Sequence, residues 1–171
     1  MDIYRAIKNR YSVRDYKLEP VPKQSLENIL SAGRLAPSGH NKQPWKFVVV
    51  QNEDKKRKLA RAAHHQDFVG QAPIVIVAVG LEPDYVMSCG ISACAVNLAI
   101  AVSHMILAAV AEGLGTCWIG AFDQNQVRDV LNIPEKYKVV ALLPLGFPAD
   151  RPGPKIRKNL SEVVCYDDFS E

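Results

Sequence analysis

The stretch from Ile91 to Ala111 is the strongest constraint that this sequence places on its fold. It consists mostly of Ala, Val, Leu and Ile, and Asn97, Ser103 and His104 interrupt it. The stretch is long enough to cross a bilayer, but no collar of charges and no second such segment supports that interpretation. We therefore predict a buried helix from about Met87 to Glu112 that is hydrophobic nearly all round. Such a helix needs apolar cover on every side, and in a chain of 171 residues a partner subunit is a natural source of it.

The segments around this helix alternate between helical and extended patterns. Four further helices are expected. The first runs from Asp2 to about Arg10, and the second contains Leu26, Ile29 and Leu30 and ends before Pro37. The other two cover 53–64 and Asp123 through Leu131. Strands are expected over 45–51, 73–80, 116–119 and 138–147. After Pro148 the chain becomes polar and proline-rich, which indicates an extended tail over about 150–171. The order predicts one α+β domain of three layers, with a mixed central sheet between helices.

Composition narrows the function classes. Hydrophobic residues make up 48% and charged residues 23%, which is typical of a globular domain. The net charge of +3 argues against a dedicated nucleic-acid binder. No Gly-x-Gly-x-x-Gly follows a predicted strand, so a dinucleotide-binding Rossmann domain is not expected. Cysteine and histidine spacings match no zinc site, and the N-terminus shows no apolar signal region, so we expect no metal and a cytoplasmic location.

Two arginines and a serine alternate at Arg10, Ser12 and Arg14. If this segment leaves the first helix extended, the three side chains share one face. Guanidinium forks match phosphate oxygens, and a serine hydroxyl or a backbone amide can complete a phosphate cradle. The alternative is a surface cluster paired with Asp15 or Glu19, and the motif alone does not decide between the two.

A second loop runs from Pro37 to Trp45 into the first predicted strand. The amides of Asn41 and Gln43 each donate and accept, which suits the pyrimidine edge of a flavin. Ser38 and Gly39 permit close approach of the backbone. The alternative is a simple turn before a strand, and the loop by itself favours that alternative.

Two further segments gain weight only in combination. Gly113 to Asp123 is a turn of small residues in which Gly120 can present a backbone N–H to a ligand, although tight packing explains it as well. In the tail, Lys155 and Arg157 lie on one side of an extended chain and could close over a phosphate.

In this order and spacing, the segments resemble the FMN-dependent nitroreductase family along nearly the whole chain. The matching pieces are Arg10-x-Ser12-x-Arg14, Pro37-Ser38-x-x-Asn41-x-Gln43-Pro44-Trp45, Gly113 to Gly120, and Lys155-x-Arg157. Each piece is weak alone. Together they are fairly specific for the family but not for a substrate, and the chain resembles a small, single-domain member.

The resemblance implies FMN as cofactor, NADH or NADPH as electron donor, and a homodimer with FMN at the subunit interface, wrapped by the tail. It implies that the flavin carries the chemistry, with no catalytic side chain, and that Arg14 near flavin N1 and Gly120 near N5 tune it. Pro37, Ser38, Gly39 and Asn41 would reach the flavin of the other subunit. The full set of residues implied to bind FMN is Arg10, Tyr11, Ser12, Arg14, Pro37, Ser38, Gly39, Asn41, Trp118, Ile119, Gly120, Lys155 and Arg157.

The implied activity moves a hydride from NAD(P)H to FMN and then two electrons to a nitroaromatic, a quinone or a similar small molecule, in two alternating half-reactions. Neither nucleic acid nor a membrane is an expected partner. Two alternatives stay open. One is a relative with other flavin chemistry, such as dehalogenation or flavin breakdown, and the other is a non-enzymatic protein that binds or stores FMN.

Overall fold

Four strands form one sheet in the order β1-β2-β4-β3 in the computed structural model, which describes residues 1–170. They are β1 (Trp45–Val50), β2 (Ile74–Gly80), β3 (Gly115–Thr116) and β4 (Lys138–Gly146). Neighbouring strands pair antiparallel. An isolated parallel bridge joins Ser12 to Thr116 at the β3 edge. The predicted mixed sheet is therefore an antiparallel sheet whose parallel contact is this bridge.

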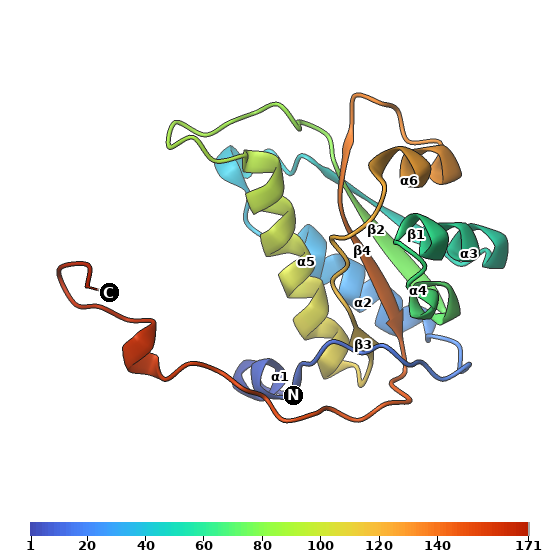
Figure 1. The fold of residues 1–171 in the computed structure, drawn as a ribbon, viewed down its shortest axis with the longest axis horizontal. Helices are drawn as coiled ribbons and strands as arrows, with labels where there is room; N and C mark the ends of the chain where they lie inside the picture. Colours follow the sequence, from blue (N-terminus) through green and yellow to red (C-terminus); the bar gives the residue numbers. More distant parts are fainter. Residues whose placement is uncertain (171) are drawn as a thin grey trace.

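Helices cover both faces of the sheet, which confirms the three-layer prediction (Figure 1). On one face lie α2 (Lys23–Arg34) and α5 (Ala93–Ala111), and on the other lie α3 (Glu53–Ala62), α4 (Asp67–Gln71) and α6 (Gln124–Leu131). Every residue of β2 is buried. Because side chains alternate along a strand, Ile74, Ile76 and Ala78 join the core under α5, while Val75, Val77 and Val79 join the core under α3. A strand that is apolar on both faces needs both layers.

Side-chain caps set where most of the helices begin. Asp2 caps α1 (Ile3–Asn9), and Asn52 and Asp123 cap α3 and α6 in the same way. Helix α5 begins at Ala93 rather than near Met87, so the predicted start was wrong by about one and a half turns. The helix starts there because the Ser92 side chain caps it by accepting the N–H of Ala95. The residues before Ser92 form a turn in which the backbone of Gly90 is left-handed at φ +84°.

Helix α5 is buried where it faces α2 and the sheet and is exposed or half-buried along the rest of its surface, so it is not covered on every side within one chain. Eight of its residues, among them Leu98 and Met105, are buried against α2 and the sheet. Ala95, Ala99 and Ser103 form an exposed stripe on the remaining side. Within residues 1–170, α5 is also the helix that is long and apolar enough to cross a membrane, a criterion that core helices commonly meet.

The chain after β4 first runs beside the segment that follows α1 and then leaves the body. Lys17 donates its N–H to Phe147 at 2.9 Å, and Ala149 donates to Asp15 at 2.9 Å. Residues 151–170 are exposed, and the tail projects away from the rest of the molecule (Figure 1). This confirms the extended tail, apart from a short 3-10 turn at Leu160–Glu162. Glu171 lies outside the described residues, and the wrapping of a dimer stays a prediction.

Candidate functional site

The Arg10–Arg14 segment and the start of the tail enclose a cavity of about 500 Å³. It unites six of the predicted residues, although the two segments lie far apart in the sequence. We call it the basic cavity. Its lining consists of Arg10, Tyr11, Ser12, Arg14, Asp150, Arg151, Gly153, Pro154, Lys155 and Arg157.

The sheet edge fixes the orientation of this segment. Val13 donates its N–H to the carbonyl of Thr116 at 3.0 Å, and its side chain is fully buried. Because alternate side chains of extended backbone point to opposite sides, Ser12 and Arg14 turn outward to the cavity. Gly115 permits this close contact, since a Cβ built on it would lie 2.3 Å from Val13 Cγ2. The predicted shared face is therefore formed.

The basic cavity holds five cationic side chains and one carboxylate. None of the cations takes part in an ion pair within residues 1–170. The pKa of Lys155 is lowered, first by desolvation and then by the positive charges of Arg10 and Arg157. Lys155 Nζ donates to the carbonyl of Lys8. Crowded cations without counter-ions favour an anion in their midst, and a phosphate monoester, with about two negative charges and several acceptor oxygens, fits this donor set.

The carboxylate of the basic cavity, Asp150, was missed by the sequence prediction. Its Oδ1 and its carbonyl each accept the Tyr11 hydroxyl at 3.1 Å, and its Oδ2 accepts the N–H of Arg14 at 3.1 Å. Burial, followed by the hydrogen bond and the charge of Asp150, raises the pKa of Tyr11 to about 12, so the phenol stays a donor at neutral pH. No local signal points to Asp150, because its partners lie 136 and 139 positions away.

The Pro37 loop lines a different cavity, of about 250 Å³, against the start of α5. Pro37, Ser38 and Gly39 face Tyr85, Met87 and Asn97 there. The loop is held from both ends, because Gly39 donates its N–H to Asn97 Oδ1 at 3.2 Å and Gln43 donates to Ser38 Oγ at 2.9 Å. Within one chain the structure does not join this loop to the basic cavity.

The same loop carries unusual backbone strain. His40, Asn41 and Gln43 all adopt the left-handed region, with φ of 53°, 55° and 51°. Asn41 is exposed and does not line the cavity of its neighbours. Strained residues concentrate at binding sites, which keeps the loop a candidate for ligand contact.

Three of the predicted residues, Trp118, Ile119 and Gly120, follow β3 and differ in their burial and in their backbone hydrogen bonds. Ile119 is buried, and both its N–H and its carbonyl bond to Leu142, at 2.9 and 3.1 Å. Its backbone groups are therefore committed to the sheet. Gly120 is exposed, and its N–H has no acceptor among residues 1–170. Gly120 lines a third cavity of about 480 Å³, while Trp118 is 37% exposed beside it in sequence.

Cys117 lies behind the basic cavity and is 2% exposed. Burial raises its pKa, while Arg14, the Ser12 hydroxyl and Arg10 oppose that shift. A buried thiol with a raised pKa is a packing residue rather than a nucleophile.

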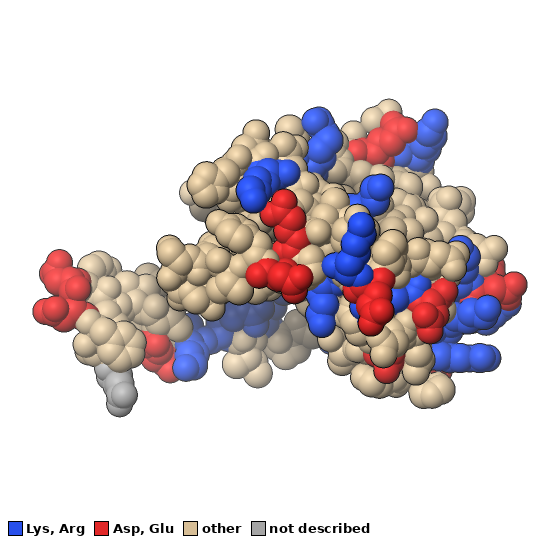
Figure 2. Space-filling view, turned by 90° about the horizontal axis from the view of Figure 1, so that it is seen from above, with Lys and Arg blue, Asp and Glu red and all other residues tan. Residues whose placement is uncertain are grey.

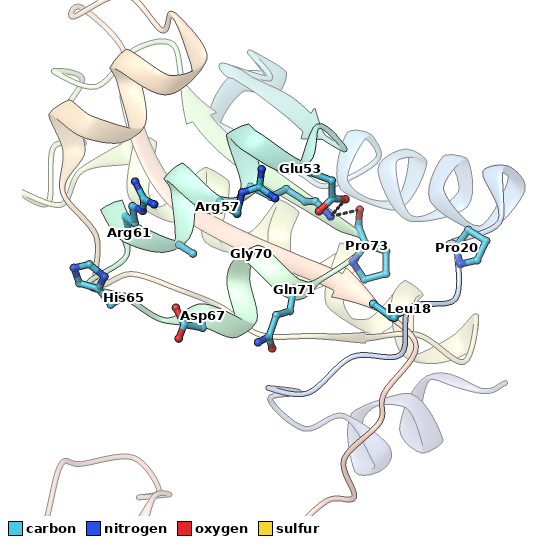
Figure 3. Close-up of a pocket in the computed structure, with 12 residues that line it drawn as sticks. Leu18, Pro20, Glu53, Arg57, Arg61, His65, Asp67, Gly70, Gln71 and Pro73 are labelled. Atoms are coloured by element: carbon cyan, nitrogen blue, oxygen red, sulfur yellow. Dashed lines mark hydrogen bonds and ion pairs between the residues drawn. The ribbon is translucent and has the colours of Figure 1, made fainter.

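A cavity of about 690 Å³ lies elsewhere, over α3 and α4 (Figure 3). Its buried lysine, Lys56, pairs with Glu53 at 2.7 Å and donates to the carbonyls of Ala72 at 2.8 Å and Pro73 at 3.3 Å. That ammonium is fully satisfied, so Lys56 itself requires no ligand. Basic and acidic groups are also interspersed on the face seen in Figure 2, without a single basic stripe.

Comparison with known proteins identifies the family. The profile of the nitroreductase family matches residues 7–80 and 60–147. A putative NADH dehydrogenase/NAD(P)H nitroreductase of Methanothermobacter thermautotrophicus is 32% identical over 90% of this chain and 81% of its own. An iodotyrosine deiodinase of Thermotoga neapolitana is 28% identical over 98% of both chains. The NADPH:FMN oxidoreductase of Vibrio harveyi, solved with NAD+, is 27% identical with a TM-score of 0.90 over 99% of this chain and 78% of its own.

The fold is an α+β architecture with helices on both faces of its sheet. The chain belongs to the nitroreductase family. This confirms the resemblance derived from the sequence.

Proposed function

We propose that the basic cavity holds the phosphate of FMN and that the chain passes electrons from NAD(P)H to a small organic acceptor. The chain is an NAD(P)H-dependent flavin oxidoreductase of the nitroreductase family, with FMN as its cofactor. The observation that carries the assignment of the site is the set of five cations around one cavity that have no ion-pair partner among residues 1–170.

Each part of the site has a distinct task in this proposal. Arg10, Lys155 and Arg157 bind the phosphate from two sides, and the Ser12 hydroxyl adds a further hydrogen bond. When bound, FMN supplies the redox chemistry, since it accepts a hydride and gives up two electrons. The guanidinium of Arg14 would stabilise negative charge near N1 of the ring. The N–H of Gly120, which has no acceptor among residues 1–170, would donate to N5.

The complete site requires a second copy of the chain. The strained Pro37 loop is separate from the basic cavity of its own chain, so we propose that Pro37, Ser38, Gly39 and Asn41 contact the flavin of the partner subunit. The exposed stripe of small residues on α5, Ala95, Ala99 and Ser103, supplies the dimer surface. The tail carries exposed apolar side chains, including Ile156 at 85% and Phe169 at 86%, which a partner subunit would cover.

A cytoplasmic location fits the cysteines. Cys89 and Cys165 are exposed free thiols, and Cys94 and Cys117 are buried free thiols. Thiols in this state persist in a reducing compartment.

Steady-state kinetics with two varied substrates test the proposal. With NADH or NADPH as donor and a quinone or a nitroaromatic as acceptor, we expect parallel double-reciprocal lines, because both substrates use the same site in turn. Intersecting lines would show that donor and acceptor are bound together, which contradicts alternating half-reactions.

Dehalogenation is the second candidate, favoured by the deiodinase relative that covers 98% of this chain. The discriminating assay supplies an iodinated phenol anaerobically with the reduced protein. Release of iodide at a rate above that of quinone reduction would favour dehalogenation, and absence of iodide would favour the quinone or nitroaromatic acceptors. Flavin breakdown would show as loss of the flavin spectrum under oxygen.

A further inference from the structure

We propose that Asp150 is a positioning residue that anchors the tail so that Lys155 and Arg157 face Arg10 across the basic cavity. The inference rests on the proposed FMN site. It adds a residue that does not itself bind the phosphate but decides whether the tail cations can do so.

Asp150 stands at the point where backbone pairing of the tail ends. Before it, Phe147 and Ala149 pair with Lys17 and Asp15, at 2.9 Å each. At the next position the side chain takes over, because Asp150 Oδ2 accepts the N–H of Arg14 at 3.1 Å. The carboxylate thus adds one more hydrogen bond between the tail and the Arg10–Arg14 segment, at the point where the chain enters the basic cavity.

The anchor uses neutral donors and leaves the cations free. Asp150 accepts from the Tyr11 hydroxyl and from a backbone N–H, and it takes part in no ion pair within residues 1–170. If the same carboxylate were paired with Arg10 or Arg157, it would compete with the phosphate. Hydrogen bonds that include a charged group are among the stronger ones, so this arrangement holds the tail without neutralising the site.

The spacer after Asp150 transmits its position to the tail cations. Arg151, Pro152, Gly153 and Pro154 separate it from Lys155. Both prolines have a fixed φ, which stiffens the spacer. No backbone hydrogen bond joins 151–158 to the body among the described residues, and the side-chain contact of Lys155 with Lys8 is the next attachment. The placement of Lys155 and Arg157 therefore depends on Asp150 at one end of the spacer and on the contact of Lys155 with Lys8 at the other.

Limited trypsin digestion of the FMN-free protein tests the anchor directly. Trypsin can cut the tail after Lys155, Arg157 and Lys158, whereas Pro152 protects the bond after Arg151. We expect Asp150→Ala to speed the loss of the tail, followed by mass spectrometry, and to weaken FMN binding by roughly ten- to a hundredfold. Asp168→Ala, in the distal tail, is the matched control and should change neither.

Two further variants separate positioning from general loss of structure. Asp150→Asn keeps an acceptor for the Tyr11 hydroxyl and should restore part of the protection and of the FMN affinity. Tyr11→Phe should speed tail cleavage as well. Its effect should be smaller in the Asp150→Ala background than in the wild type, because only the bond to the Asp150 carbonyl is then left to lose. Thermal unfolding of each variant verifies that the body is folded.

Unchanged tail cleavage in Asp150→Ala would overturn the inference. Tighter FMN binding in that variant would also overturn it, because Asp150 would then act only by repelling the phosphate. If the wild-type protein binds no FMN, the proposed function fails instead, while the digestion of the FMN-free protein still tests the anchor.

Discussion

Replacement of Gly115 by alanine should damage both the fold and the site through one contact. The added Cβ would lie 2.3 Å from Val13 Cγ2 and 3.0 Å from Val13 Cβ, where ordinary contacts are 3.4–4 Å. Val13 is fully buried and cannot move away without shifting its backbone. Overpacking of this kind costs about 1–3 kcal/mol.

This cost predicts how far Gly115→Ala lowers Tm and how much it weakens FMN binding. In a chain of this size, about 1 kcal/mol lowers Tm by roughly 2–4 °C. Because Val13 lies between Ser12 and Arg14, its displacement also moves two proposed ligands. If all of the strain opposes the FMN-bound form, affinity falls by roughly 5- to 150-fold. The Kd comes from fluorescence titration of FMN-free protein, and Tm comes from its thermal unfolding.

A double variant supplies the control. Val13→Ala removes the Cγ2 atom that collides, so Val13→Ala with Gly115→Ala should be less destabilised than the sum of the two single variants. A Gly115→Ala protein with the wild-type Tm and the wild-type Kd would refute the claim that this contact fixes the segment.

Three other variants test separate parts of the account. Arg14→Ala should lower the FMN reduction potential by roughly 30 mV or more, measured against a reference dye, and should slow hydride uptake more than it weakens FMN binding; an unchanged potential would remove Arg14 from this role. Arg157→Ala should lose FMN on dialysis, whereas Lys158→Ala, outside the basic cavity, should retain it, and equal retention would contradict the phosphate assignment. Hydrogen bonds from Asn28 and then Ser25 lower the pKa of Glu112 below 4.5, so its ionised form stabilises the fold above that pH. Glu112→Gln should therefore be less stable than wild type at pH 7, with the difference shrinking as the pH falls through the lowered pKa, and a difference independent of pH would refute this origin.

The strongly patterned elements were predictable from the sequence because one physical signal dominates each. The strand Ile74–Gly80 is apolar at every position but its last, which only a strand buried on both faces requires. The helix starts at Asp2 and Asp123 were predicted correctly, because an N-cap acts through its own side chain. Helix α4 was missed, since five residues are too few to show a helical period.

The start of α5 shows where pattern reasoning fails. Hydrophobicity continues N-terminal to Ser92 through Ile91 and Met87, and the pattern alone extends the helix there. The turn at Gly90 and the Ser92 cap prevent the helix from starting earlier, because a left-handed residue cannot be part of a right-handed helix.

In the site too, residues in local motifs were predictable from the sequence, and residues whose role depends on distant contacts were not. Four of the five cations of the basic cavity were predictable from Arg10-x-Ser12-x-Arg14 and Lys155-x-Arg157, since phosphate binding depends on residue type and local spacing, whereas Arg151 belongs to neither motif. Asp150 was not, because its role arises only when the tail returns to Tyr11. The commitment of the Ile119 backbone to Leu142 likewise depends on sheet pairing that no local motif reveals.

The visible absorption spectrum of the purified protein, before and after anaerobic addition of NADH or NADPH, tests the central claim most directly. We expect a flavin spectrum that bleaches when the nicotinamide is added, as a flavin reductase requires. A flavin spectrum that persists with both donors would contradict electron uptake from NAD(P)H. A colourless protein that cannot be reconstituted with FMN would contradict the assignment of the basic cavity itself.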